Sequence, residues 1–185
     1  MKKIVFVLLI AATIGGTAFS VSFDIMSYPP PVQGGNFMVD LGLGLRSMGY
    51  SNAKWKIPPI FAQVEYALPV NVPISVGGMF TISKYGYDWG GPADYKWRWT
   101  DMTFAGRANW HWGLDIDWLD LYTGLAMGYT RSVFDDGGYA VGGKDYGGFF
   151  FSAQVGAHFY FTKTIGVMAE FGYPYWLKAG VALKF

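Results

Sequence analysis

The last eleven residues, from Tyr175 to Phe185, constrain the fold of this chain more than any other stretch. Successive side chains of a β-strand point to opposite faces, so a strand here would separate every second residue. One face would be apolar and would end on the aromatic C-terminus; it carries Leu177, Ala179, Val181, Leu183 and Phe185. The other face would carry Trp176, Lys178, Gly180, Ala182 and Lys184. The pattern predicts a strand with one face in an apolar environment.

Seven stretches upstream alternate in the same way, and we predict strands over residues 37–46, 60–68, 74–84, 97–112, 119–131, 149–161 and 165–173. Only 15% of the residues are charged, against roughly 25% in soluble domains. No internal stretch reaches the ~20 apolar residues of a spanning helix. A closed barrel is the other structure that satisfies its backbone in lipid. The predicted fold is all-β: an eight-stranded antiparallel up-and-down transmembrane β-barrel, an even number as bacterial barrels require.

The residue types on each face indicate which face points inward. The polar faces are rich in Gly, Ala and Ser with one or two charges per strand, which fits a narrow interior better than a water-facing exterior. We therefore expect the apolar faces to meet lipid. Aromatic residues should gather at the two rims. We place Trp97, Trp99 and Trp176 at one rim, and Trp110, Trp112, Trp118 and Tyr160 near the other.

Three parts are predicted along the chain: a cleaved signal peptide over 1–20, a Pro-rich periplasmic leader over 21–35, and the barrel over 36–185. Lys2 and Lys3 followed by a short apolar run are typical of a signal peptide. Three consecutive prolines in the leader cannot donate to a ladder, so we expect it to be loose or lightly packed. Short turns are expected at 69–73, 113–118 and 162–164, and longer outer loops at 47–59, 85–96 and 132–148.

These features together resemble the small eight-stranded outer-membrane proteins of bacteria, the group with OmpX-like, OmpA-transmembrane-like and OmpW-like members. The resemblance covers nearly all of the mature chain and assigns no subfamily. It implies an outer-membrane location with both termini in the periplasm, contact with membrane lipid and lipopolysaccharide, and a monomer. It also implies that the apolar face ending at Phe185 is an assembly signal, read by the barrel-assembly machinery, with periplasmic chaperones acting during biogenesis.

An eight-stranded barrel encloses an interior that side chains just fill. We predict a lumen polar network of Asp40, Glu65, Arg107, Asn109, Gln154, His158, Glu170 and Lys178. Opposite charges on adjacent strands would neutralise each other where burial is costly; Glu170 should lie beside Lys178, and Glu65 within reach of Arg107. The network would plug the lumen, and the alternative is a gated conduction path. A lateral route for hydrophobic molecules, as in OmpW-like barrels, would be lined by Met38, Phe61, Met79, Phe150 and Met168.

The sequence predicts no enzyme, cofactor or metal site. Some barrels of the resembling group remodel lipid A with a His and a Ser in register, but neither His111 nor His158 is followed two residues later by Ser. A nucleophile needs a base within hydrogen-bond reach, and the sequence displays no such pairing. Two histidines without cysteines argue against a transition-metal site. A net charge of +1 that includes Lys2 and Lys3 leaves no basic field for nucleic acid.

Aromatic residues in the predicted outer loops are candidates for surface contact, because rigid rings supply contact area at low entropic cost. The candidate surface-binding residues are Tyr87, Trp89, Tyr95, Tyr139 and Tyr146. They would bind an extracellular ligand or host surface, or only cap the barrel among lipopolysaccharide headgroups. The predicted function is envelope structure or surface interaction through these loops. The alternative is a narrow channel for small or hydrophobic solutes.

Overall fold

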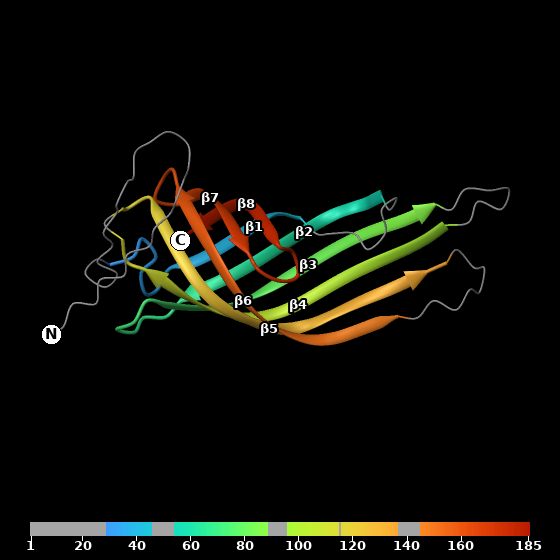
Figure 1. Ribbon diagram of the computed structural model, residues 1–185. Coiled ribbons are helices and arrows are strands. Elements are labelled where there is room, and N and C mark those ends of the chain that lie inside the picture. The colour runs from blue at the N-terminus through green and yellow to red at the C-terminus, as the bar shows by residue number, and fades with distance from the viewer. Residues whose placement is uncertain (1–28, 46–53, 89–95, 115, 137–144) are drawn as a thin grey trace, which may run out of the picture.

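The computed structural model of this chain describes residues 29–45, 54–88, 96–114, 116–136 and 145–185. Eight strands form one closed barrel in which each strand pairs antiparallel with the next and β8 pairs with β1 (Figure 1). The strands are β1 Phe37–Leu45, β2 Lys54–Ala67, β3 Ile74–Asp88, β4 Lys96–Trp112, β5 Leu119–Asp135, β6 Tyr146–Tyr160, β7 Ile165–Phe171 and β8 Leu177–Lys184. The predicted fold class is confirmed.

No helix within the described ranges is long and apolar enough to cross a membrane.

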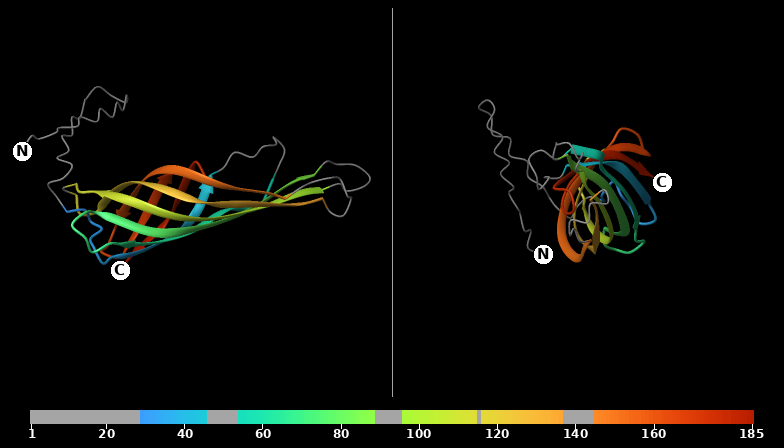
Figure 2. Two further views of the ribbon diagram at one scale, coloured as in Figure 1. Left: turned by 90° about the horizontal axis from the view of Figure 1, so that it is seen from below. Right: turned by 90° about the vertical axis from the view of Figure 1, so that its right-hand side faces the viewer.

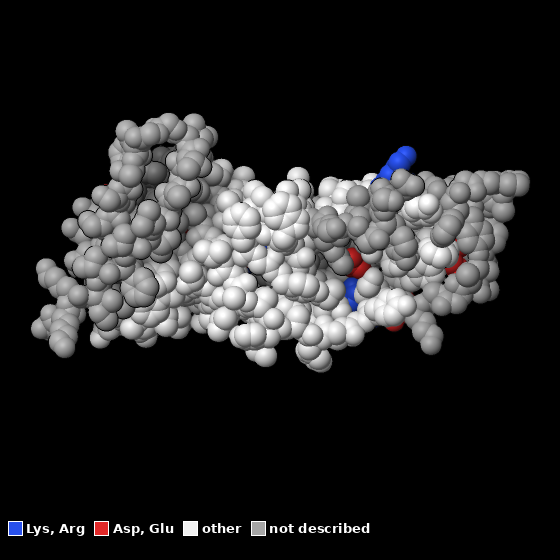
Figure 3. Space-filling view, in the orientation of Figure 1, with Lys and Arg blue, Asp and Glu red and all other residues white. Residues whose placement is uncertain are grey.

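The two faces of the barrel wall carry different kinds of residue. The outer face exposes an apolar belt with one large residue per strand at its middle: Leu41, Val64, Val76, Phe104, Leu125, Val155, Val167 and Val181. The inner face buries charged and polar side chains, together with a few apolar ones. In Figure 3 the middle of the barrel is uncharged, and charged atoms appear toward the end away from the termini. This arrangement is the inverse of a soluble barrel.

Both described ends of the barrel chain meet at one end of the barrel, which we call the terminal end (Figure 2). The N–H of Phe37 donates to the carbonyl of Phe185 at 2.9 Å, and the N–H of Phe185 donates back to Phe37 at 2.8 Å. The connections 68–73, 113–118 and 161–164 lie at this end. The opposite, distal end holds the connection 172–176 and three others, whose parts at 46–53, 89–95 and 137–144 lie outside the described residues.

Strands β2 to β6 extend further at the distal end than β1, β7 and β8 do, and this corrects the loop boundaries predicted from the sequence. Residues 54–59, 85–88, 132–135 and 146–148, predicted as loop, are strand. Strand β2 runs through Pro58 and Pro59, and its register with β3 is irregular between Trp55 and Ile60. Pairing of β1 with β2 stops at Leu43 and Ile60, and pairing of β6 with β7 stops at Val155 and Phe171.

The distal segments of β2 to β6 therefore form a five-stranded projecting sheet, which we define as residues 54–59, 83–88, 96–101, 132–135 and 146–154. Figure 1 shows these strands extending well beyond β1, β7 and β8. The rest of the barrel is a closed tube, whereas no described strand lies beside the outer edges of the projecting sheet, at residues 54–59 of β2 and 146–154 of β6.

Several aromatic residues lie elsewhere than predicted. Trp99 and Tyr160 are buried inside the barrel rather than at a rim, because they share strand parity with the inward residues. Strand β7 ends two residues before its predicted end, and strand β8 begins two residues after its predicted start. Tyr173 consequently turns inward and its ring contacts Phe150, while Tyr175 is buried with its ring over Gly44.

The described part of the Pro-rich leader, Pro29 to Gly35, crosses the terminal end as a strap, and its buried Val32 corrects the expectation of a loose or lightly packed segment. Val32 is 2% exposed and packs with Met38, Phe61 and Tyr160 among other buried residues. The ammonium of Lys184 donates to the carbonyl of Pro31 at 2.8 Å. Prolines lack a donor but keep their carbonyl, so a proline run can be held by accepting hydrogen bonds.

Closure of the barrel between β1 and β8 requires glycine at a close approach, and this gives a first prediction. A Cβ on Gly180 would lie 2.1 Å from the carbonyl oxygen of Leu41, whereas a Cβ on Gly106 in β4 would meet nothing within 4 Å. We expect Gly180→Ala to lower the free energy of unfolding by roughly 1–3 kcal/mol, the usual cost of overpacking. Gly106→Ala is the matched control and should not lower it. Urea unfolding in micelles, followed by Trp fluorescence, measures both; equal midpoints would contradict the closure argument.

Candidate functional site: a buried polar network in the lumen

Arg107 on β4 is the central cation of the lumen and is buried. Its Nε lies 2.9 Å from Oε1 of Glu65, its Nη1 donates to Oε1 of Gln63 at 2.5 Å, and its Nη2 donates to Oε2 of Glu170 at 2.5 Å. The ring of Tyr122 lies beneath the guanidinium, 5.9 Å from Cζ. The planar fork of an arginine suits several carboxylate and amide acceptors at once, and here these acceptors come from β2 and β7.

Glu170 on β7 receives three donors from three other strands. Besides Arg107, the hydroxyl of Tyr122 donates to its Oε2 at 2.8 Å, and the ammonium of Lys178 contacts its Oε1. Lys178 lies directly opposite Glu170 in the β7–β8 register and also donates to the sulfur of Met79 at 3.3 Å. A buried charge is tolerated only when it is paired and hydrogen-bonded, and Glu170 meets both conditions.

A second branch of the network runs from Glu65 across β3, β4 and β6. Oε2 of Glu65 accepts from the hydroxyl of Ser75 at 2.6 Å and from the amide of Asn109 at 2.7 Å. The amide of Gln154 donates in turn to Oδ1 of Asn109 at 2.7 Å. Each buried polar side chain therefore fixes its neighbour, which makes the interior a connected structure.

The two histidines lie toward the terminal end and share one carboxylate. His158 places Nδ1 2.9 Å from Oδ2 of Asp120 and Nε2 3.3 Å from Oδ2 of Asp40. His111 places Nδ1 3.0 Å from Asp120 and Nε2 2.9 Å from the hydroxyl of Ser75. Since Ser75 gives its proton to Glu65, its oxygen acts as the acceptor for His111. All four ring nitrogens thus face oxygen atoms, three of them facing carboxylate oxygens.

Cations and histidine rings surround the carboxylates in this part of the lumen. The carboxylates of Asp40, Glu65, Asp120 and Glu170 face the cations Arg107 and Lys178 and the rings of His111 and His158. Charge balance matters because an uncompensated ion in a low-dielectric interior is strongly destabilising.

Ser75, His111 and Asp120 are arranged like a hydrolytic triad, which corrects the sequence-based statement that no serine pairs with a histidine. A fully buried Ser75 is not in a position to attack a substrate, and its hydroxyl is held by Glu65 rather than by His111. A nucleophile requires a neighbouring base free to take its proton. The geometry is that of a structural hydrogen-bonded chain.

The structure places all eight residues of the predicted network inside the barrel. It also brings in five residues that were not assigned to that network: Gln63, Ser75, His111, Asp120 and Tyr122. Their strand parity marks them as inward, so the signal was present in the sequence, but parity does not say which inward residues touch. Among the described residues, no group of three or more His, Cys, Asp or Glu side chains is arranged to hold a metal ion.

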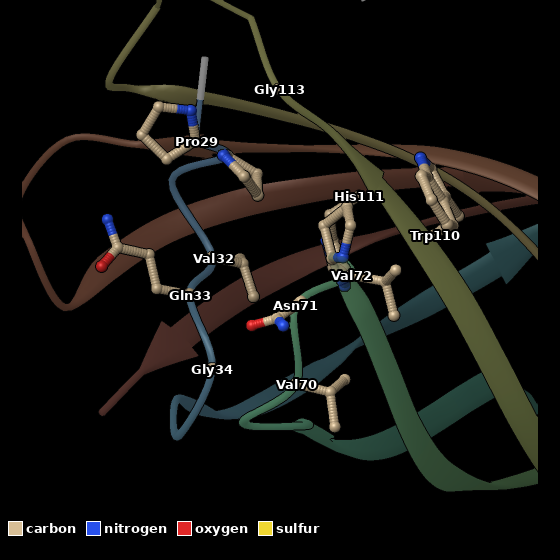
Figure 4. A pocket seen from close by; sticks show the side chains of 12 residues that line it. Pro29, Val32, Gln33, Gly34, Val70, Asn71, Val72, Trp110, His111 and Gly113 are labelled. Atoms are coloured by element: carbon tan, nitrogen blue, oxygen red, sulfur yellow. The ribbon is translucent and has the colours of Figure 1, made fainter. Parts of the chain in front are cut away.

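A cavity of about 590 Å³ lies at the terminal end, between the strap, the β2–β3 turn and the end of β4 (Figure 4). Pro29, Val32 and Gln33 form one side, and Val72, Trp110 and His111 are among the residues around the rest. The cavity reaches His111, but Ser75 is not among its lining residues. The strap therefore stands between the lumen network and the space outside this end.

The candidate surface residues are only partly within the described chain. Tyr87 lies in β3 and Tyr146 begins β6, so both are strand residues rather than the loop residues predicted. Trp89, Tyr95 and Tyr139 lie outside the described residues. The inward face of the projecting sheet instead carries an aromatic cluster in which rings contact their neighbours across strands: Trp55, Tyr85, Trp97, Trp99 and Phe134.

The residues of the predicted assembly signal occupy the outer face of β8 and the C-terminus. Val181 and Phe185 are exposed, and Leu177, Ala179 and Leu183 share their side of the strand. The face is accessible along the whole strand.

This closed barrel, with an apolar belt outside and a buried ionic network inside, has the fold of the small eight-stranded outer-membrane β-barrels. The solved structure of Ail, the attachment invasion locus protein of Yersinia pestis, in complex with the heparin analogue sucrose octasulfate is similar at a TM-score of 0.54 and 13% identity, covering 83% of this chain and all of that one. The N-terminal β-barrel domain of Pseudomonas aeruginosa OprF is similar at a TM-score of 0.51 and 12% identity, covering 83% and 98%. No protein-family profile and no curated protein sequence matches the chain.

The pairing of Lys178 with Glu170 gives a second prediction. Lys178→Met removes the ammonium and leaves Glu170 with fewer compensating donors, so we expect a loss of about 3–5 kcal/mol in the free energy of unfolding. The control Lys163→Met removes a lysine from an exposed turn and should change little. Adding Glu170→Gln to Lys178→Met should recover part of the loss. An unchanged unfolding midpoint for Lys178→Met would show that the pair contributes nothing.

Proposed function

We propose that this chain is an integral protein of the bacterial outer membrane whose lumen is plugged and whose function lies at its distal end, in envelope structure or surface interaction. The observation that carries the proposal is the polar network that joins β1 through β8 inside the barrel. Side chains that bond one another across the whole interior leave function to the outer surfaces. We expect no enzymatic activity.

The location is supported by the apolar belt, which fits a lipid environment, and by the similarity to outer-membrane barrels. In this proposal the terminal end faces the periplasm and the projecting sheet faces outside. The exposed apolar face of β8 and Phe185 would be read by the barrel-assembly machinery, and periplasmic chaperones would hold the chain before insertion. Membrane lipid and lipopolysaccharide would surround a monomeric barrel.

The distal end has features that suit an extracellular ligand. Lys54, Lys56 and Arg98 are exposed on the outward face of the projecting sheet. The side chains of Lys56 and Arg98 approach each other over Gly86. Clustered cations attract polyanions, and Ail has been solved with a heparin analogue. A sulfated glycan is therefore the first class of ligand to test.

The plugged lumen gives a third prediction. The mature chain, refolded from denaturant and checked by the mobility difference between boiled and unboiled samples, should produce no discrete openings in a planar lipid bilayer. Reproducible single-channel openings would instead support the alternative function, a narrow channel for small or hydrophobic solutes.

The surface role gives a fourth prediction, with heparin-coated beads as the probe. Arg98→Glu should weaken retention of the folded barrel by about five-fold, since one basic contact to an anionic surface is worth roughly 1 kcal/mol. Lys163→Glu changes the net charge equally but lies at the terminal end, so it should not weaken retention. Equal effects of both variants would indicate attraction by net charge alone, and no retention of the parent barrel would exclude this ligand class.

A further inference from the structure

Hydrogen bonds hold the walls of the cavity at the terminal end in place. Besides the contact between the strap and the lysine of β8 described above, the N–H of Gly35 donates to the carbonyl of Ala67 on β2 at 2.8 Å. The β2–β3 turn is tied to β4, because the N–H of His111 donates to the carbonyl of Pro73 at 2.8 Å. The strap and the turn are therefore fixed on three strands, and the cavity between them is formed before a ligand arrives, as in most small-molecule sites.

The lining of this cavity is mainly apolar and carries no charged side chain. Prolines and valines are the commonest of its lining residues, and none of these residues is Lys, Arg, Asp or Glu. His111 also reaches the cavity, but its two ring nitrogens face Asp120 and Ser75 inside the barrel. An ion that left water for this lining would lose hydration without gaining a partner of opposite charge. The cavity therefore favours an uncharged ligand.

One polar side chain of the lining is available to such a ligand. Figure 4 shows the amide of Asn71 between the β2–β3 turn and the strap, whereas the amide of Gln33 points away from the turn. No hydrogen bond within the described part of the chain involves the amide of Asn71. A side-chain amide offers one acceptor oxygen and two donor hydrogens, so it can meet a hydrogen-bonding group on an otherwise apolar molecule.

The size of the cavity and the exposed valines in its wall indicate a small molecule. Its volume of about 590 Å³ lies within the range of roughly 300–1,000 Å³ that is typical of ligand pockets. Val70 and Val72 line the cavity from the β2–β3 turn, and they leave 54% and 41% of their surface exposed. A ligand in the cavity would remove apolar surface of this wall from water, which is favourable.

We propose that the cavity between the strap, the β2–β3 turn and the end of β4 is a binding site for a small, uncharged and mainly apolar molecule, with one hydrogen-bonding group that meets the amide of Asn71. The site lies at the opposite end of the barrel from the projecting sheet, so it does not depend on the proposed role of the distal end. In a plugged barrel the molecule is held at the terminal end and does not pass through the lumen.

Two fluorescent probes that share one ring system test the ligand class: 1-anilinonaphthalene, which is neutral, and its 8-sulfonate, which is anionic. Both are titrated into the folded mature chain in phosphatidylcholine nanodiscs, and the signal of empty nanodiscs is subtracted. The neutral probe should bind saturably, and the dissociation constant of the sulfonate should be about ten-fold higher or more, because the lining offers no cation. Absence of saturable binding by the neutral probe, or equal constants for the two probes, would overturn the proposal.

Substitutions in the β2–β3 turn test the position of the site. Val72→Trp fills the cavity and should raise the dissociation constant of the neutral probe about ten-fold or more, and Val70→Trp is a second filling variant. Val167→Trp places the same ring on the apolar belt of β7 and should change this constant by less than about two-fold. Asn71→Ala should weaken binding about five-fold, the loss expected for one hydrogen bond. If the Trp variants of the turn and of the belt bind the probe alike, and all show the heat-dependent mobility of a folded barrel, the probe lies in lipid and the proposal is wrong.

A variant that lacks residues 21–28, which directly precede Pro29 in the sequence, tests whether the chain itself supplies the occupant. The dissociation constant of the neutral probe should stay within about two-fold of that of the mature chain. Probe binding that appears only after this deletion, or that tightens about ten-fold or more, would show that the preceding segment of the same chain fills the cavity, and it would overturn a site for a free small molecule. Heparin retention is measured on Val72→Trp in parallel. Unchanged retention together with lost probe binding separates this site from the proposed glycan surface.

Discussion

The requirement that every charge inside the barrel be compensated there governs the rest of the structure. Arg107 and Glu170 are buried against each other, and Glu170 also holds Lys178 and Tyr122. Their side chains come from two pairs of neighbouring strands, β4–β5 and β7–β8, that face each other across the interior, so the network can form only when the sheet closes. The cost of an unpaired buried ion thus couples the interior to the closure of β8 on β1.

The two halves of the barrel differ in the side chains that their inward faces carry. Apart from Gln154, the polar network occupies the part where all eight strands pair, and a strap with buried Val32 covers its terminal end. Beyond it, β1, β7 and β8 stop while β2 to β6 continue as the projecting sheet. There the inward face carries aromatic rings that contact one another across strands, together with the buried carboxylate of Asp101.

The two outer edges of the projecting sheet, on β2 and on β6, differ in the regularity of their register and in their residue types. On β2, Pro59 and an irregular register remove the regular row of donors. On β6, the register is regular and the exposed residues are aromatic.

The sequence by itself determined the number of strands and the inward or outward direction of nearly every strand residue, because a period of two is a local property of the chain. It failed at residues 54–59, where β2 continues through Pro58 and Pro59 with an irregular register, and at the strap, where the carbonyl of Pro31 accepts from Lys184 and Val32 is buried. Only the tertiary structure decided that Ser75, His111 and Asp120 touch, that Asp120 contacts both histidines, and that no described strand lies beside residues 146–154 on the β7 side of β6. These depend on register and shear between strands far apart in the chain, which local alternation does not encode.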